Sequence, residues 1–275
     1  MRRLAILAAL AVQGITCKHA LALVVLTFDT PVPGTIQDVN GLGIGFTDRL
    51  PRTGASLPTN DPNLLLSGGK LFTTSTRSDI NGSVNLPIAE APTLFFSGIG
   101  SADVVIKMLV DGIQLPTWSD QLGIIVGTPT NDTLRVNLHA DGRYIFTENW
   151  SGSGYSDEWP FYSGPMFNNG DDILLSLARN SGLWSMSWDN LTQVSSGSTP
   201  WYSVPWLNSS NDLYFGFYHA SPRTDNSVTN AIDYFSVDVG PNTGGQVPEP
   251  ASWLIWGALA ALAAAGRWRH RRSAG

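Results

Sequence analysis

Short apolar or alternating runs, separated by Gly, Pro, Asn and Asp, fill the chain from residue 23 to residue 240. Runs of this kind predict β-strands joined by tight turns. Polar serines alternate with Trp184, Met186 and Trp188, which places these three side chains on one face of a half-buried strand. No amphipathic segment reaches the roughly 10 to 15 residues that a helical crossover takes. The pattern therefore predicts an all-β body with antiparallel sheets.

Composition agrees with this pattern. Only 14% of the residues are charged, and the chain has 28 Gly and 17 Pro but just four Glu and three Lys, too few for long surface helices. A chain of 275 residues can bury a sizeable core, and we expect one large domain. The predicted strands lie at about residues 24–29, 41–47, 63–76, 92–98, 103–110, 121–128, 133–140, 143–150, 172–180, 183–189, 212–220 and 231–239.

The net charge of −6 conceals an uneven distribution of basic residues. Seven of the basic residues and Glu249 lie outside residues 23–246. That body holds 21 acidic and 9 basic residues, a net charge of −12. An acidic body repels phosphate backbones, so we expect no nucleic-acid partner.

Residues 1–22 have the order of a secretory signal peptide. Two arginines are followed by an apolar stretch, and an Ala-Leu-Ala cleavage site ends at Ala22. An uncleaved anchor is disfavoured because Lys18 interrupts the apolar run well short of the roughly 20 residues that a span needs. A lipoprotein modified at Cys17, the only cysteine, is disfavoured because Thr16 precedes it where Gly or Ala is usual. We therefore expect export with cleavage after Ala22.

The C-terminal segment has three parts in a fixed order. They are the tetrad Val247, Pro248, Glu249 and Pro250, a predicted transmembrane segment at 251–266, and a basic cluster of Arg267, Arg269, Arg271 and Arg272. The two prolines prevent a helix from continuing and hold Glu249 in an extended, accessible segment. The positive-inside rule places the basic cluster in the cytoplasm and the body outside. Hydropathy alone is equally consistent with a plain C-terminal anchor.

This succession of VPEP, short span and arginines resembles the PEP-CTERM sorting signal of Gram-negative bacteria that make extracellular polysaccharide, over about residues 246–275. The resemblance implies that an exosortase recognises Pro-Glu-Pro and processes the tail after a transient stay in the inner membrane. The body would then be released or attached at the cell surface. On this interpretation the chain divides into a signal peptide (1–22), a β-sandwich domain (23–240), a linker (241–246) and a sorting signal (247–275).

The order of the runs in the body carries a second resemblance. SGGKLFTT is followed by DVVIKMLV, QLGIIVG and a long aromatic segment, and then by DILLSLARNSGLWSMSWD, LYFGFYHA and AIDYFSVDV. This order resembles the concanavalin A-like lectin and glucanase superfamily, which includes laminin-G-like modules. The resemblance implies an antiparallel two-sheet sandwich of jelly-roll type. A β-sandwich of another topology is the alternative.

The sequence lacks the motifs of common hydrolases. Glycosidases of that superfamily carry paired acids, commonly as E-x-D-x-x-E, because retaining hydrolysis needs carboxyl groups about 5 to 5.5 Å apart. The chain has neither this motif nor HExxH, GxSxG or a Gly-rich phosphate loop with Lys. His139 is interpreted as a turn or surface residue, because a lone His without a placed nucleophile carries little signal. We therefore expect no enzymatic activity.

Aromatic residues gather in the segment 144–167, interleaved with carboxylates, amides and Gly. Exposed rings of this kind can stack on sugar faces while neighbouring polar groups bond the hydroxyls. The alternative is a satellite core in which the rings pack beneath a long loop, the commoner fate of large aromatics. The candidate glycan-binding residues are Trp150, Tyr155, Trp159 and Tyr162.

A calcium site is the one cofactor that the resemblance suggests. Members of the superfamily often clamp their first and last strands with Ca²⁺ on the convex sheet, and Asp29 and Asp233 are the candidate ligands here. Hard cations take carboxylate and backbone oxygens. The alternative roles are a turn initiator for Asp29 and a cross-strand partner for Asp233.

The leading interpretation is a secreted, non-enzymatic surface or extracellular-matrix protein that is sorted by an exosortase and binds extracellular polysaccharide. One alternative is an atypical glycan-active hydrolase of the same fold. The other is a purely structural or adhesive module.

Overall fold

The computed structural model describes the greater part of the body of the chain, within a compact unit that spans residues 1–242. The predicted linker and sorting signal lie outside the described residues, as does the predicted leader except for its last residue, Ala22. Those residues are 22–50, 60–75, 91–116, 120–139, 144–149, 156–159, 167–221 and 227–240.

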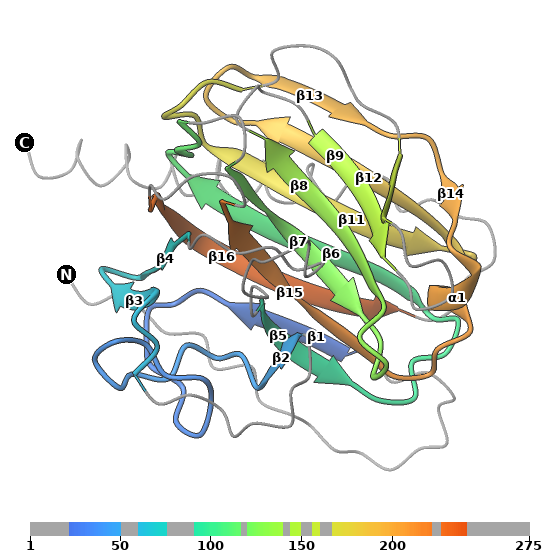
Figure 1. Cartoon of the computed structure of the whole chain (residues 1–275), viewed down its shortest axis with the longest axis horizontal. Coiled ribbons are helices and arrows are strands. Elements are labelled where there is room, and N and C mark those ends of the chain that lie inside the picture. The colour runs from blue at the N-terminus through green and yellow to red at the C-terminus, as the bar shows by residue number, and fades with distance from the viewer. Residues whose placement is uncertain are drawn as a thin grey trace, which may run out of the picture. The chain divides into compact units, whose positions relative to one another are not determined.

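Two antiparallel sheets form the body (Figure 1). The first has nine strands, in the spatial order β13 (Ser195–Ser198), β12 (Leu183–Asn190), β11 (Ile173–Asn180), β6 (Asp103–Asp111), β16 (Thr229–Gly240), β4 (Lys70–Thr74) and β3 (Leu64–Ser67). Off this path, β1 (Ala22–Leu26) pairs with β16, and β14 (Tyr202–Ser203) pairs with β12.

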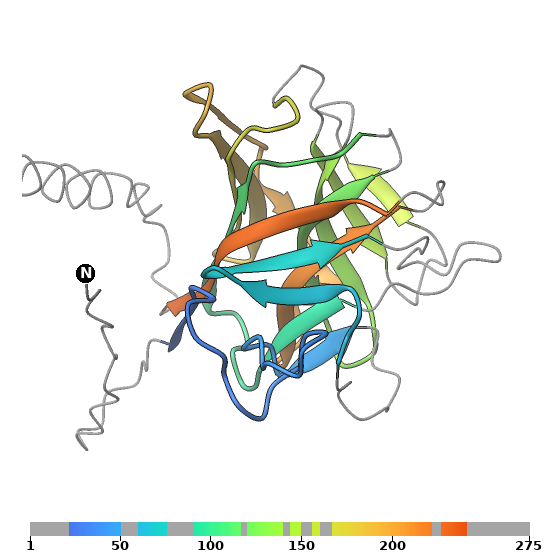
Figure 2. The ribbon, with the colours of Figure 1, turned by 90° about the vertical axis from the view of Figure 1, so that its left-hand side faces the viewer.

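The second sheet has seven strands. Their spatial order is β10 (Ser156–Trp159), β9 (Tyr144–Asn149), β8 (Thr133–His139), β7 (Gln121–Gly127), β15 (Leu213–Ala220), β5 (Ala91–Phe96) and β2 (Asp48–Leu50). The described part of the chain adds one short helix, α1 (Pro205–Asn208). Figure 2 shows the two sheets as facing layers. The prediction of an all-β, antiparallel two-sheet sandwich is confirmed.

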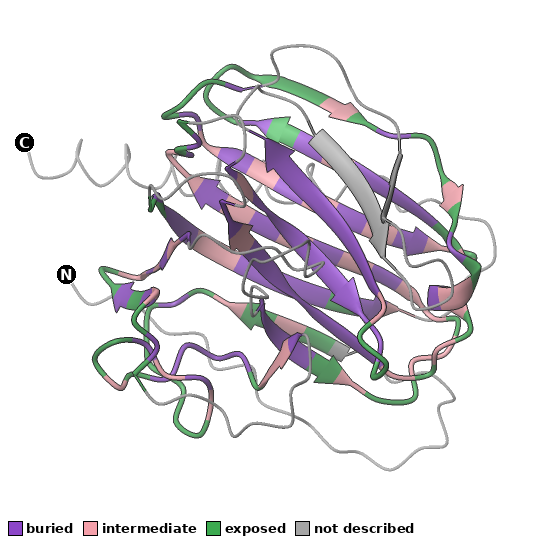
Figure 3. Ribbon diagram, viewed as in Figure 1, coloured by how far each residue is buried: buried purple, intermediate pink, exposed green. Residues whose placement is uncertain are grey.

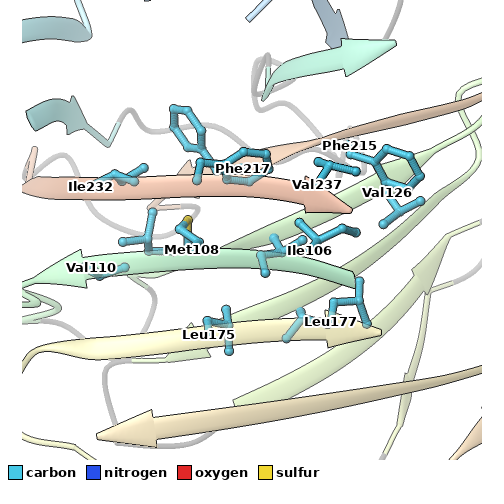
Figure 4. Packing of buried hydrophobic residues seen from close by; sticks show 14 of the residues in the cluster. Ile106, Met108, Val110, Val126, Leu175, Leu177, Phe215, Phe217, Ile232 and Val237 are labelled. Atoms are coloured by element: carbon cyan, nitrogen blue, oxygen red, sulfur yellow. The ribbon is translucent and has the colours of Figure 1, made fainter. Parts of the chain in front are cut away.

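The core lies between the sheets, and period-2 alternation supplies it. Every second residue of β6, from Val104 to Val110, is fully buried, as are Leu175 and Leu177 on β11. Phe215 and Phe217 on β15 approach them from the seven-stranded sheet (Figure 4). Full burial of side chains of this size is worth roughly 1.5 to 3 kcal/mol each relative to exposure. This shared core fixes how the strands of both sheets are placed.

The alternation predicted around Trp184, Met186 and Trp188 is confirmed, because all three side chains are buried. The run at 63–76 forms two strands rather than one, since Gly68 and Gly69 have positive φ and turn the chain between β3 and β4.

The strand predicted at 41–47 is wrong, because only isolated bridges form there, such as Gln37 with Gly43. Gly41 and Gly45 both have positive φ, which interrupts an extended strand. The buried carboxylate of Asp38 accepts hydrogen bonds from the backbone of Leu42 and of the distant Leu66. A loop held by Asp38 therefore replaces the expected strand.

None of the helices in the described ranges is long and apolar enough to span a bilayer. The transmembrane segment predicted at 251–266 lies outside those ranges and stays a prediction.

Candidate functional site: the outer face of the seven-stranded sheet

The outward-facing residues of β8, a strand of the seven-stranded sheet, are polar and yet buried. Along β8, Leu134, Val136 and Leu138 point into the core, so the intervening residues point outward. Two of these are Arg135 and Asn137, which are only 3% and 2% exposed. In Figure 3, β7, β8 and β15 are coloured as buried along almost their whole length. Buried polar side chains need hydrogen-bond partners, either in the protein or in a ligand.

Strand register places side chains from the neighbouring strands beside this row. Gln121 lies opposite His139, and Gly123 lies opposite Asn137. On the other side of β7, Tyr218 lies opposite Gly123. Two tyrosines of β15, Tyr214 and Tyr218, are both 1% exposed and belong to a small apolar cluster on this face. The face thus combines amides, an imidazole, a guanidinium and aromatic rings.

Glycine allows neighbouring strands of this sheet to approach closely. A Cβ added at Gly216 would lie 1.9 Å from the carbonyl oxygen of Pro92, and one at Gly123 would lie 1.8 Å from that of Val136. Both distances are far below contact, so no larger residue fits unless the backbone moves. The two central strands β7 and β15 therefore depend on glycine at these positions.

Gln121 is the centre of a hydrogen-bond network on the face. Its Oε1 accepts hydrogen bonds from the Tyr218 hydroxyl (3.1 Å) and from Asn137 Nδ2 (3.4 Å). Its Nε2 lies 3.4 Å from Nε2 of His139. The guanidinium of Arg135 lies over the ring of Tyr218, 5.3 Å from its centroid. These contacts fix the orientation of Gln121, which is only partly buried and can present its amide to a ligand.

Three further polar atoms on the face have no hydrogen-bond partner among the residues that the structure describes. They are Thr93 Oγ1, Thr133 Oγ1 and Asn137 Oδ1. A buried donor or acceptor left unpaired costs about 1 to 3 kcal/mol. Hydroxyl groups of a ligand are one chemistry that would satisfy them.

One large aromatic ring at the margin of this face is open to solvent. Phe95 on β5 is 43% exposed, and its ring centroid lies 4.9 Å from that of Tyr214 at an interplanar angle of 34°. An exposed ring supported by a buried one is a rigid apolar platform.

The outward positions of β7, β8 and β15 that the structure describes include no Asp or Glu. The paired carboxylates of a retaining glycosidase are therefore not supplied by these three strands.

Of the aromatic residues predicted to bind glycan, Trp150, Tyr155 and Tyr162 lie outside the described residues. Trp159 is the last residue of β10, and its side chain is not described. Because β10 pairs with β9 and β9 with β8, the topology brings this predicted segment into the sheet that carries the polar row. The role of these four residues stays a prediction.

The interpretation of His139 as a turn or surface residue is wrong, since it ends β8 and is 8% exposed. The polar row that it belongs to was also missed. In the sequence, polar residues that alternate with Leu and Val predict a strand with one solvent-exposed face. Burial of that face depends on tertiary packing, which the alternation within a single strand cannot predict.

A second polar cluster lies between the sheets. The ring of His219 on β15 contacts Thr73 Oγ1 at 3.4 Å and Asn230 Nδ2 at 3.2 Å, and both partners belong to the nine-stranded sheet. Burial lowers the pKa of His219 to about 4, against the opposing effects of Asp120 and of a hydrogen bond with Thr73. His219 is therefore neutral at pH 7.

The structure brings the two calcium candidates into electrostatic contact. Asp233 lies at the irregularity in β16, and its pKa is raised mainly by burial and also by Asp111, Asp29 and Asp172, while Lys70 lowers it. Lys70 forms an ion pair with Asp111. No group of three or more metal-binding side chains suited to an ion occurs among the described residues. Calcium at Asp29 and Asp233 stays a prediction, at a place where a lysine already supplies positive charge.

The sorting motif Val247, Pro248, Glu249 and Pro250 and the cluster of Arg267, Arg269, Arg271 and Arg272 lie outside the described residues. Export and processing by an exosortase therefore stay predictions.

Comparison with known proteins rests on structure alone. No protein-family model matches the chain, and no curated protein matches it in sequence.

Solved structures with a similar fold include proteins of several kinds. The CBM2 module of an evolved Dit protein from Lactobacillus casei BL23 phage J-1 has a TM-score of 0.53 at 9% identity, over 82% of this chain and 98% of that module. The GH43 protein BlXynB of Bacillus licheniformis has a TM-score of 0.54 at 12% identity, over 78% of this chain but only 39% of its own length. Winged bean acidic lectin, complexed with methyl-α-D-galactose, has a TM-score of 0.50 at 9% identity, over 80% and 99% of the two chains.

At these identities the similarity establishes the fold and nothing more. The chain has a lectin-like, concanavalin A-like β-sandwich fold, as the order of its strands had suggested.

Proposed function

We propose that the protein is an exported, non-enzymatic glycan-binding protein of the bacterial surface or extracellular matrix. Its binding site would be the outer face of the seven-stranded sheet. The observation that carries the proposal is the buried polar row of β8, where Arg135 and Asn137 lie beside aromatic rings. Polar groups beside aromatic rings suit a saccharide, because its ring faces are apolar and its edges carry hydroxyls.

Two members of the face are open enough to meet a ligand first. Phe95 offers a stacking surface at one margin. Gln121, held by Tyr218 and Asn137, offers an oriented amide at the other end of the face. A polysaccharide would contact these two residues and hydrogen-bond with the polar groups behind them.

The absence of acids from the outward positions of the three described central strands supports binding rather than hydrolysis. The fold is shared with a lectin and a GH43 protein, which is consistent with a glycan-related role but selects no ligand.

The binding site can be tested with two matched exposed aromatic residues. Phe95 is 43% exposed on the seven-stranded sheet, and Trp201 is 39% exposed between β13 and β14 of the other sheet. We expect Phe95→Ala to weaken binding of the host's extracellular polysaccharide about tenfold, a loss of about 1.4 kcal/mol. Trp201→Ala should bind like the wild type. The measurement is the retardation of the full chain in native gels that contain increasing polysaccharide.

Two results would contradict the proposal. If both substitutions weakened polysaccharide binding equally, binding would not depend on this face. Shortening of the polysaccharide by the wild-type protein would show that the protein is an enzyme.

Delivery to the outside is proposed from the sequence of the two ends. Glu249 lies between two prolines ahead of the apolar segment and the arginines. We expect the wild type to lose its C-terminal mass in the native host and Glu249→Ala to keep it in the membrane fraction. Retention of the tail by both proteins would mean that the tail is a plain anchor.

A further inference from the structure

A buried guanidinium lies at one end of the sandwich, away from the face described above. Arg179 is near the end of β11, between Val104 of β6 and Trp184 of β12 in the strand register, and it is 1% exposed. Its Cζ lies 5.4 Å from the centroid of the Trp184 ring. The indole of Trp184 in turn donates a hydrogen bond to Asn208 at the end of α1 (3.0 Å). The side chain is therefore held at the core end where α1 packs.

Most of the hydrogen-bonding capacity of Arg179 is unused in the described part of the chain. Its Nε donates to the carbonyl oxygen of Ala102 at 2.8 Å. Within the part of the chain that the structure describes, neither terminal nitrogen has a hydrogen-bond partner. Asp103 affects Arg179 electrostatically, but its Oδ1 accepts a hydrogen bond from the backbone of Ser181. The four N–H donors of the terminal nitrogens therefore have no acceptor among the described residues.

Such an arrangement is costly unless something completes it. A buried charge without a partner costs several kcal/mol, and an unpaired buried donor adds to that cost. Burial lowers the pKa of Arg179, but only to about 10, so the group keeps its charge at pH 7. An apolar residue would fill this place at lower cost if the position were purely structural.

We propose that Arg179 binds a carboxylate through its two terminal nitrogens. The planar fork of a guanidinium matches the two oxygens of a carboxylate and forms two parallel hydrogen bonds with them. A carboxylate carries one negative charge and balances the single guanidinium, whereas sulfate or phosphate would bury excess charge near Asp103. The carboxylate would belong either to a free small acid or to an acidic sugar of a polysaccharide.

A carboxylate would have to reach Arg179 past Ala102, whose carbonyl oxygen accepts the hydrogen bond from Nε and which is only partly buried. Ala102, Ile99 and Trp206 are partly exposed and pack against the core cluster at its margin. The proposal is independent of the glycan-binding face, since no residue is shared between the two sites.

The test measures the thermal unfolding midpoint of the purified full chain in sodium acetate and in sodium chloride of equal ionic strength. We expect acetate to raise the wild-type midpoint by several degrees in a saturable manner, because a ligand that binds only the folded state stabilises it. Arg179→Met should show no such rise and should be at least as stable as the wild type in chloride. Arg179→Lys keeps the charge but not the fork, and it should lose most of the response.

The proposal would be overturned if acetate had no specific effect on the wild type. It would also be overturned if either variant responded as fully as the wild type, or if sulfate stabilised the wild type more than acetate did. Sodium glucuronate distinguishes the two sources. Saturation at lower concentration than acetate would identify an acidic sugar, and saturation at equal concentration would identify a free carboxylate.

Discussion

The outward-facing residues of the two sheets differ in burial, and the sequences of the strands do not predict this difference. On the nine-stranded sheet, β6 and β11 alternate strictly between buried and partly buried residues, as expected for a sheet with one wet face. On the seven-stranded sheet, β8 alternates between polar and apolar residues just as regularly, but every one of its residues is buried. Similar alternation therefore leads to two different environments.

Burial decides whether a polar side chain needs a partner other than water. Polar residues on a wet face need no explanation, because water satisfies them. The same residues under cover must find partners in the protein or in a ligand, and three buried polar atoms of this face have none among the described residues. The covered face is for this reason the stronger candidate for a binding site.

The largest effect is expected where the covered face leaves no space. Gly216→Val would place side-chain atoms on the backbone of Pro92, which lies 1.9 Å from the position of a Cβ. We expect a loss of more than about 3 kcal/mol in the free energy of unfolding. Ala178→Val, on the outer face of β11, is the control and should change stability by less than about 1 kcal/mol. Urea denaturation measures both, and similar losses would mean that the two faces tolerate bulk equally.

A smaller effect is expected from acid. In the unfolded chain His219 takes up a proton near pH 6.5, whereas in the folded protein it does so only near pH 4. Stability that is fully present above pH 6.5 is therefore lost as the pH falls toward 4, by up to about 3 kcal/mol. Asp233 acts in the opposite direction, because its raised pKa makes the folded state hold a proton that the unfolded state releases.

His219→Gln removes this titration and should flatten the fall in unfolding midpoint between pH 6.5 and 4.5. Asp233→Asn is the matched control on the other sheet, and it should leave that fall in place or steepen it. If His219→Gln were as acid-sensitive as the wild type, the cluster between the sheets would not be the source of the pH dependence.

Most of the fold could be predicted from the sequence, because each strand produces its own local alternation of apolar and polar residues. Strands announce themselves through local alternation, as at Trp184, Met186 and Trp188, and all three are buried as predicted. The loop at 41–47 could not be predicted in this way, because its conformation depends on a hydrogen bond from the backbone of the distant Leu66 to the carboxylate of Asp38. A contact between residues so far apart in the chain does not change the local pattern of apolar and polar residues.

The candidate site was harder to predict than the fold. Gln121, Asn137 and Tyr218 come from three strands and meet only through register. Each has an ordinary sequence context in its own strand, whereas the aromatic segment at 144–167 carries a strong local signal. Arg179 was missed for a related reason, since a charged residue at the end of a strand is normally exposed.

Glycan binding at the outer face of the seven-stranded sheet is tested most directly by a comparison of one hydroxyl on each outer face. Tyr218→Phe removes the donor that holds Gln121 at 3.1 Å, and Tyr234→Phe removes a hydroxyl from the outer face of β16. We predict that Tyr218→Phe weakens affinity for the host polysaccharide about tenfold, or about 1.4 kcal/mol, while Tyr234→Phe binds as the wild type does. Equal affinity of the two variants, or weaker binding by Tyr234→Phe, would contradict the assignment of the covered face as the binding site.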